Sequence, residues 1–230
     1  MSKATFLGLS GKTAIVTGGA TLIGAAVVRA LHAQGVRVTL ADIDAAGGQA
    51  VADGCGEGVW FRATDITDDA QVSACADETA ARFGSVDFLV NLACSYVDDG
   101  LRSGRADWHK ALDVNVASAA MMLKAVLPHM RRMGGGAVVN FTSISSGVAQ
   151  TGRWLYPVSK AALVQLTRNM AMDLAPEHVR VNSVSPGWTW SAIMNQLTGG
   201  DRAKTDAVAA PFHLLKRVGD PAEVAQVVLF

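Results

Sequence analysis

The chain has 230 residues, of which half are hydrophobic and 17% are charged. This length suits one large α/β domain with a substantial core and is too short for two domains of ordinary size. The 20 Lys and Arg residues balance the 20 Asp and Glu residues. Because the net charge is zero and the basic residues form no cluster, we expect neither a nucleic-acid nor a membrane surface.

The cysteines and the first residues indicate a soluble, cytoplasmic protein. Three cysteines, Cys55, Cys75 and Cys94, are odd in number and lack metal-like spacing, which is typical of reduced thiols. Residues 1–10 contain no apolar core of a secretory signal, and no run approaches the roughly 18 apolar residues of a membrane span. The five histidines are scattered, so we expect no bound metal.

Short β-branched runs alternate with longer helical patterns along the chain. The expected order is strand 12–17, helix 23–34, strand 36–41, helix from 44, strand 59–63, helix 68–83, strand 86–91, one long helix 104–133, strand 136–142, helix 158–174, strand 179–184 and a last helix 221–230. This alternation predicts an α/β fold, a doubly wound parallel sheet with helices on both faces. Such sheets bind ligands beyond the carboxyl ends of their strands.

We expect a single domain over residues 1–230, since no linker or repeat interrupts the pattern. Residues 187–211 form the one long segment with weak periodicity. A segment of that kind is usually a lid or a binding element.

A glycine-rich turn, Thr17 to Gly24, lies between the first expected strand and the first helix. A helix N-terminus offers free N–H groups and a positive dipole end, on which a pyrophosphate can sit. Gly18 permits the tight turn and Gly24 lets the helix pack closely on the sheet. The alternative is an ordinary strand-to-helix turn.

Asp42 ends the second expected strand, 24 residues after Gly18. A carboxylate there can accept both hydroxyls of an adenosine ribose and would repel a 2′-phosphate, so NAD is expected in preference to NADP. A plain surface acid is the alternative. Asp65 is expected to bind the adenine amino group, together with the backbone of Ile66. Helix capping is the alternative role of Asp65.

Tyr156 and Lys160 are four residues apart and share one face of a helix whose first turn contains Pro157. Alcohol oxidation needs a base for the hydroxyl proton, and a neighbouring ammonium lowers the pKa of a phenol. Ser143, at the end of the fifth strand, can donate to the developing oxygen charge. Asn115 can hold a water behind Lys160. A core tyrosine beside a surface lysine, with polar packing, is the alternative.

The motifs in this order and spacing resemble the short-chain dehydrogenase/reductase family, in its shorter-subunit branch, from Leu9 to the last residue. The resemblance implies a Rossmann-type fold and a catalytic tetrad of Ser143, Tyr156, Lys160 and Asn115. It also implies that Asn91 and the Pro186-Gly187 turn lie along the cofactor. The full set of expected NAD contacts is Gly18, Thr21, Leu22, Ile23, Gly24, Asp42, Asp65, Ile66, Asn91, Ala93, Tyr156, Lys160, Pro186, Gly187, Trp188 and Thr189.

The sequence departs from the family pattern at several positions. Leu22 replaces the middle glycine of the turn, Cys94 ends a stretch that usually reads NNAG, and Ser191 replaces a threonine. Relatives continue past Phe230 into a last strand, so the final strand of the fold is expected to be missing. The resemblance also implies a homotetramer or dimer built on helices 104–133 and 158–174.

The expected function is NAD(H)-dependent hydride transfer between nicotinamide and a secondary alcohol or ketone, such as a small alcohol, polyol, hydroxy acid or 3-oxoacyl compound. Substrate contacts are expected from Cys94, Ser145, Gln150, Arg153 and Trp188, although the tryptophans can equally pack the lid onto the body. The alternative is a non-catalytic NAD-binding sensor or scaffold of the same fold. An epimerase or dehydratase would need a larger C-terminal domain.

Overall fold

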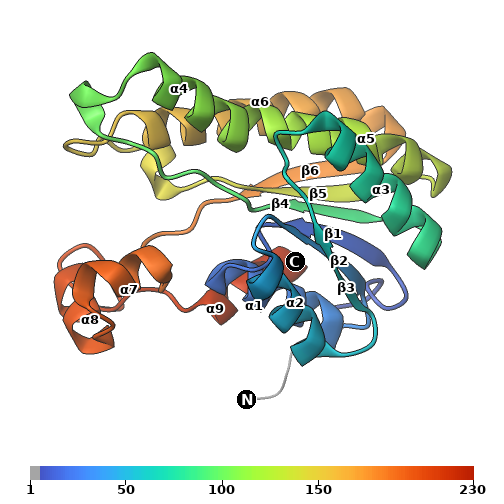
Figure 1. Ribbon diagram of the computed structural model, residues 1–230, viewed down its shortest axis with the longest axis horizontal. Coiled ribbons are helices and arrows are strands. Elements are labelled where there is room, and N and C mark those ends of the chain that lie inside the picture. The colour runs from blue at the N-terminus through green and yellow to red at the C-terminus, as the bar shows by residue number, and fades with distance from the viewer. Residues whose placement is uncertain (1–5) are drawn as a thin grey trace.

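The computed structural model describes residues 6–230, apart from the side chain of Leu197. Its centre is a sheet of six parallel strands in the order β3-β2-β1-β4-β5-β6 (Figure 1). The strands are β1 Thr13–Thr17, β2 Arg37–Asp42, β3 Val59–Ala63, β4 Phe88–Asn91, β5 Gly136–Phe141 and β6 Val179–Val184. The order reverses between β1 and β4, which confirms the doubly wound architecture.

The central strand β1 is buried along its whole length because helices cover both faces of the sheet. One face carries α3 (Asp69–Phe83), α4 (Arg105–Leu112), α5 (Ser118–Arg132) and α6 (Leu155–Leu174) (Figure 1). The other carries α1 (Leu22–Ala33), α2 (Ala45–Cys55) and α9 (Pro221–Leu229). Each face has its own hydrophobic cluster, and α1 packs directly against α9.

Three expected elements differ in the structure. The long helix 104–133 is α4 and α5 joined by a π-helical turn, Asp113–Ala117. Helix α6 begins at Leu155 rather than Val158, so Pro157 lies inside its first turn, where no N–H is needed. Residues 187–211 contain two short helices, α7 (Ala192–Thr198) and α8 (Arg202–Ala209), which begin at the capping side chains of Ser191 and Asp201.

The stretch Arg105–Arg132 is long and apolar enough to cross a membrane by length and composition, unlike the expectation from the sequence. A single stretch of this kind is weak grounds for a membrane span. In the fold α5 packs against α3 and against strands of the sheet, and its Met122, Val126 and Met130 lie in the core. The apolar residues of this stretch therefore have a place in a globular core. Residues 1–5, part of the segment analysed for a secretory signal, lie outside the described residues.

Candidate active site

The turn after β1 presents free backbone N–H groups at the start of α1. Thr21 caps the helix, because its hydroxyl accepts a hydrogen bond from the Gly24 N–H and donates one to the Gly18 carbonyl. Within residues 6–230 the N–H groups of Leu22 and Ile23 have no protein acceptor. Such groups at a helix N-terminus fit an anion, and the arrangement fits the pyrophosphate of a dinucleotide. Leu22, at the position of the missing glycine, is 45% exposed.

Gly18 and Gly24 are required by close contacts. Gly18 has a φ of +71°, and a Cβ on it would lie 2.7 Å from the Ala93 nitrogen. A Cβ on Gly24 would lie 2.1 Å from the Gly18 carbonyl oxygen. The ends of β1 and β4 therefore touch at the point where the strand order reverses, and this is where the sequence predicts the cofactor.

Asp42 ties this turn to the end of β2. One of its carboxylate oxygens accepts a hydrogen bond from the Ala20 N–H at 2.9 Å and the other accepts one from the Asp44 N–H at 3.0 Å. The side chain is half-buried and keeps acceptor capacity on both oxygens. Asp65 is exposed, and its carboxylate accepts hydrogen bonds from the Thr67 N–H and hydroxyl. The expected capping role belongs to Asp68, which caps α3.

Asn91 uses its side chain inside the protein. Its amide nitrogen donates to Asn140 at 2.9 Å and to the Ala119 carbonyl at 3.4 Å. The side-chain nitrogen of Asn91 is therefore used inside the protein, and the contact of Asn91 with a cofactor stays a prediction. The sequence missed Thr17, whose hydroxyl oxygen accepts hydrogen bonds from the N–H groups of Leu92 and Ala93 and so links β1 to the end of β4.

The expected catalytic side chains come together beyond β5. Ser143 lies two residues after the end of β5, and its side chain acts to lower the pKa of Tyr156 of α6. One turn further along α6, the ammonium nitrogen of Lys160 lies 5.6 Å from the centroid of the Tyr156 ring. Lys160 is only 3% exposed and donates to the Phe141 carbonyl at 2.7 Å, which holds its charge at the end of the sheet.

The pKa of Tyr156 is shifted in the direction opposite to the expectation. Burial raises the pKa of Tyr156 to about 12, and the Cys94 side chain acts in the same direction. Hydrogen bonds from Ser143 and Tyr96 and the charge of Arg153 oppose this rise. The phenol is therefore protonated in the cofactor-free protein near neutral pH. The sequence could show the helical spacing of the two residues but not the loss of water around the phenol.

Asn115 lies in the π-helical turn between α4 and α5 and is buried. Its oxygen accepts from the Ser95 N–H at 2.7 Å, and its nitrogen donates to the Ser95 carbonyl and to the Ser159 hydroxyl, each at 3.0 Å. A π-helical turn inside an α-helix is frequent at functional sites. Here it aims Asn115 at the loop after β4 and at α6.

Two residues of that loop were missed by the sequence analysis. The Tyr96 ring stacks on Tyr156 with centroids 5.0 Å apart and an angle of 17° between the planes. The fully buried Asp98 carboxylate accepts hydrogen bonds from the N–H groups of Trp154 and Tyr156, both at 2.9 Å. The only sequence signal was that Tyr96 is one of two tyrosines in the chain.

The remaining expected substrate residues surround this cluster. The half-buried Cys94 thiol donates a hydrogen bond to the Ser95 carbonyl at 3.4 Å, and burial raises the pKa of that thiol. Ser145 is buried against Ser143, at 3.2 Å between hydroxyl oxygens. The Gln150 carbonyl accepts from the Arg153 N–H in the turn before α6.

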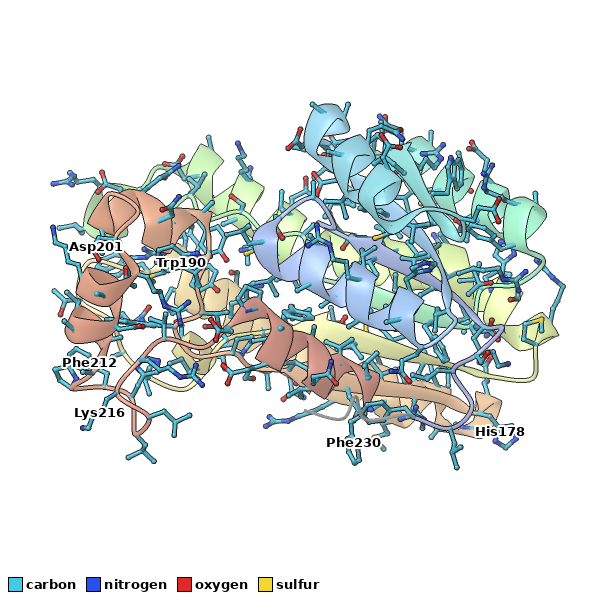
Figure 2. All side chains as sticks on the ribbon, turned by 90° about the horizontal axis from the view of Figure 1, so that it is seen from below. His178, Trp190, Asp201, Phe212, Lys216 and Phe230 are labelled. Atoms are coloured by element: carbon cyan, nitrogen blue, oxygen red, sulfur yellow. The ribbon has the colours of Figure 1, made fainter. Side chains whose placement is uncertain are left out.

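The residues after β6 lead into helices α7 and α8. Trp188 packs on Phe212, with ring centroids 5.4 Å apart, and Trp190 contacts the Arg202 guanidinium. Figure 2 shows Trp190, Asp201, Phe212 and Lys216 gathered at one end of the molecule. Both contacts favour the packing role for these tryptophans. The Thr189–Gly219 bridge joins the start of this segment to the residues just before α9.

Among residues 6–230, no group of three or more His, Cys, Asp or Glu side chains is arranged to hold a metal ion. The three cysteines are free thiols.

Comparison with known proteins agrees with this geometry. The family model described as enoyl-(acyl carrier protein) reductase matches residues 18–230. L-fucose dehydrogenase of Mus musculus is 33% identical over 225 residues, covering 96% of this chain and 82% of that protein. The cis-4-hydroxycyclohexanecarboxylate dehydrogenase of Sinomonas cyclohexanicum is 36% identical over 225 residues, covering 95% and 88%.

Solved structures give the same result. A short-chain type dehydrogenase/reductase from Mycobacterium marinum has a TM-score of 0.87 at 32% identity, covering 96% of this chain and 88% of that one. A 7α-hydroxysteroid dehydrogenase complexed with NADH and 7-oxo glycochenodeoxycholic acid has a TM-score of 0.90 at 30% identity, covering 100% and 90%.

The family match spans the glycine-rich turn, the loop after β4 and the helix that contains Tyr156 and Lys160. The fold is that of the nucleotide-binding Rossmann type, and the relatives are dehydrogenases and reductases. The chain is therefore an oxidoreductase that transfers hydride between a nicotinamide cofactor and a secondary alcohol or ketone, and it belongs to the short-chain dehydrogenase/reductase family.

Proposed function

We propose that the chain interconverts small ring-borne secondary alcohols and their ketones, with NAD(H) preferred over NADP(H). Relatives named for fucose and for a hydroxycyclohexanecarboxylate support a cyclic alcohol. Asp42 supports NAD, because its carboxylate lies beside the turn and would repel a 2′-phosphate. The free N–H groups at the start of α1 would hold the pyrophosphate, with Gly18 and Gly24 giving the backbone close access.

The nicotinamide, when bound, accepts or supplies the hydride. Tyr156 moves the proton at the alcohol oxygen, since its phenol is the acid–base group beside the Ser143 hydroxyl. Ser143 donates a hydrogen bond to the oxygen that gains charge, which stabilises the transition state. Both groups act on one oxygen atom of the substrate, which lies between the two side chains.

Lys160 provides a buried positive charge close to the phenol. This charge favours the phenolate once a substrate proton must be accepted, and its ammonium N–H groups suit the nicotinamide ribose. Asn115 has the role of a positioning residue for the loop at Ser95 and for α6 at Ser159. If a water behind Lys160 carries the proton to solvent, Asn115 lies next to that water.

The other parts of the proposal concern the substrate and the assembly. Cys94, Ser145, Gln150, Arg153 and Trp188 form the walls around the substrate, and residues 187–211 form a lid over it. The whole chain acts as one domain. We further propose a soluble, cytoplasmic homo-oligomer, a tetramer or a dimer.

The observation that carries the proposal is the meeting of Ser143, Tyr156 and Lys160 beyond β5. The test is a panel of cyclic alcohols and ketones, run with NAD(H) and with NADP(H), followed by the absorbance of the reduced nicotinamide. We expect turnover that favours NAD(H) and that Tyr156→Phe abolishes while NADH binding persists. NADH binding without turnover of any compound would instead favour a sensor of the same fold.

A further inference from the structure

Arg153 brings a positive charge to the side of the catalytic tyrosine. It lies two residues before α6, and its guanidinium carbon is 5.6 Å from the centroid of the Tyr156 ring. Its charge also acts on Cys94 and Tyr96, the neighbouring residues of the loop after β4. The side chain is 39% exposed, so a ligand bound at Tyr156 can reach it.

The donors of Arg153 are unused within the protein. Among the described residues its side chain makes no hydrogen bond, and its Nε is buried without an acceptor. Its one ionic partner is Asp98, at 3.5 Å from Nε, and the Asp98 oxygens already accept backbone N–H groups. The Nε–H faces Asp98, whereas the NH1 and NH2 groups are not buried and make no hydrogen bond among the described residues, so they are left for an acceptor that the protein does not supply.

Other arginines of this chain show the contrast. Arg62 binds both carboxylate oxygens of Glu78, and Arg217 binds both oxygens of Glu223. Each of those two guanidinium groups forms a bidentate pair with one carboxylate, whereas Arg153 forms no such pair among the described residues. Planar two-point recognition is the interaction in which arginine exceeds lysine.

The backbone at Arg153 is held in place. A Cβ on Gly100 would lie 3.0 Å from the Gly152 carbonyl oxygen, so the loop after β4 is in close contact with the turn before α6. The Arg153 N–H donates to the Gln150 carbonyl, which closes that turn. Asp98 on one side and this turn on the other fix where the guanidinium can lie, and this lowers the cost of ordering it on binding.

We propose that Arg153 binds a carboxylate on the substrate, so that the substrate class is a secondary hydroxy acid and its keto acid. This inference rests on the proposed function of Tyr156 at the same site. The carboxylate lies within one small ring of the reacting carbon, because the guanidinium and the phenol are neighbours. The NH1 and NH2 groups take its two oxygens, and Asp98 retains the Nε side.

The test compares 4-hydroxycyclohexanecarboxylate with its methyl ester and with cyclohexanol, each at saturating NAD. A charged hydrogen-bonded pair predicts a kcat/KM for the acid about 10- to 100-fold above that of the ester, mainly through KM. Arg153→Gln should remove this ratio, because the kcat/KM of the acid falls towards that of the ester, and Arg153→Lys should restore part of it. Arg102→Gln is the matched control, since Arg102 lies in the loop after β4 but is 81% exposed and pairs with Asp99.

A binding experiment keeps the inference testable if none of the three alcohols is a good substrate. Calorimetry with cyclohexanecarboxylate and with cyclohexanecarboxamide, in the presence of NADH, should show tighter binding of the acid by about tenfold or more, lost in Arg153→Gln. Equal binding of acid and amide, or an unchanged acid preference in Arg153→Gln, would overturn the carboxylate site. Turnover of cyclohexanol in the same preparations would show that the proposed function still stands.

Discussion

At the scale of single residues, the two tyrosines of the chain share one environment. Their rings are stacked, and burial raises the pKa of both above the ordinary value near 10, to about 12 for Tyr156. Since the folded state keeps protons that the unfolded state releases, the free energy of unfolding falls as the pH rises from about 10 towards 12.

This environment predicts an unusual alkaline titration. The tyrosinate absorbance of the folded, cofactor-free protein should stay low at pH 10, where free tyrosine is half ionised. Ionisation should begin only near pH 12, and in urea both phenols should titrate normally. Tyr96→Phe should halve the amplitude in urea. A full transition near pH 10 in the folded protein, with the fold intact by circular dichroism, would contradict the burial argument.

Asp42 gives a second prediction at this scale. Asp42→Ala should weaken NAD binding about tenfold and bring the affinities for NAD and NADP closer together, because a charged acceptor and a repulsive charge are both lost. Fluorescence titration with NADH and NADPH measures both constants. Asp53→Ala removes an acid of α2 that pairs only with Gln49 and is the control. Unchanged affinities for both cofactors in Asp42→Ala would refute the assignment.

Residue spacing made part of the site predictable. Tyr156 and Lys160 are one helical turn apart and Ser143 follows the end of β5, and their assignment as catalytic residues came from the family resemblance together with this spacing. Asp98 could not be found in this way, because its partners Trp154 and Tyr156 lie more than 50 residues further along the chain. The pKa of Tyr156 was predicted in the wrong direction, because burial depends on segments that only the fold brings together.

At the scale of elements, the start of α6 depends on another segment for its cap. Burial alone would raise the pKa of the Asp98 carboxyl, but hydrogen bonds from the backbone of Trp154, Tyr156 and Gly100 hold it below its usual value. The stability that this provides is present above the unfolded pKa, near 4, and is lost as the pH falls through the folded value.

Asp98→Asn should therefore lower stability and activity together. Its amide nitrogen would face a backbone N–H, so the free energy of unfolding should fall by about 1–3 kcal/mol. The kcat should also fall, because the N–H of Tyr156 loses its acceptor. Urea unfolding and steady-state kinetics measure the two effects. Asp99→Asn, at a neighbouring carboxylate that is 60% exposed, should change neither by much.

Periodicity located most elements but not their interruptions. Strands β3 and β6 have the expected bounds, because Val59, Trp60 and Phe61 begin β3 and three valines recur along β6, in both cases between clear breaks. The π-helical turn at Asp113–Ala117 leaves no signal in hydrophobic periodicity, since one extra residue in a turn only shifts the pattern slightly. Helices α7 and α8 are too short for their periodicity to stand out.

At the scale of the whole molecule, the packing of α1 against α9 joins segments almost 200 residues apart in sequence. Leu31 of α1 is 3% exposed and lies in the same hydrophobic cluster as Val228 and Leu229 of α9. Leu31→Ala should lower the free energy of unfolding by about 2–5 kcal/mol, since it leaves a cavity between them. Leu7→Ala, at a leucine that is 97% exposed, should have little effect in the same urea titration. Equal effects of the two substitutions would be inconsistent with this packing.

The same α1–α9 contact has a consequence for synthesis on the ribosome. Chains emerge from the N-terminus and domains begin to fold as they appear. The apolar side of α1, including Val27 and Val28, has no covering helix from α9 until residues 221–229 have left the exit tunnel. For most of its translation the nascent polypeptide therefore exposes an apolar surface of the kind that chaperones bind. Folding is completed only late in translation.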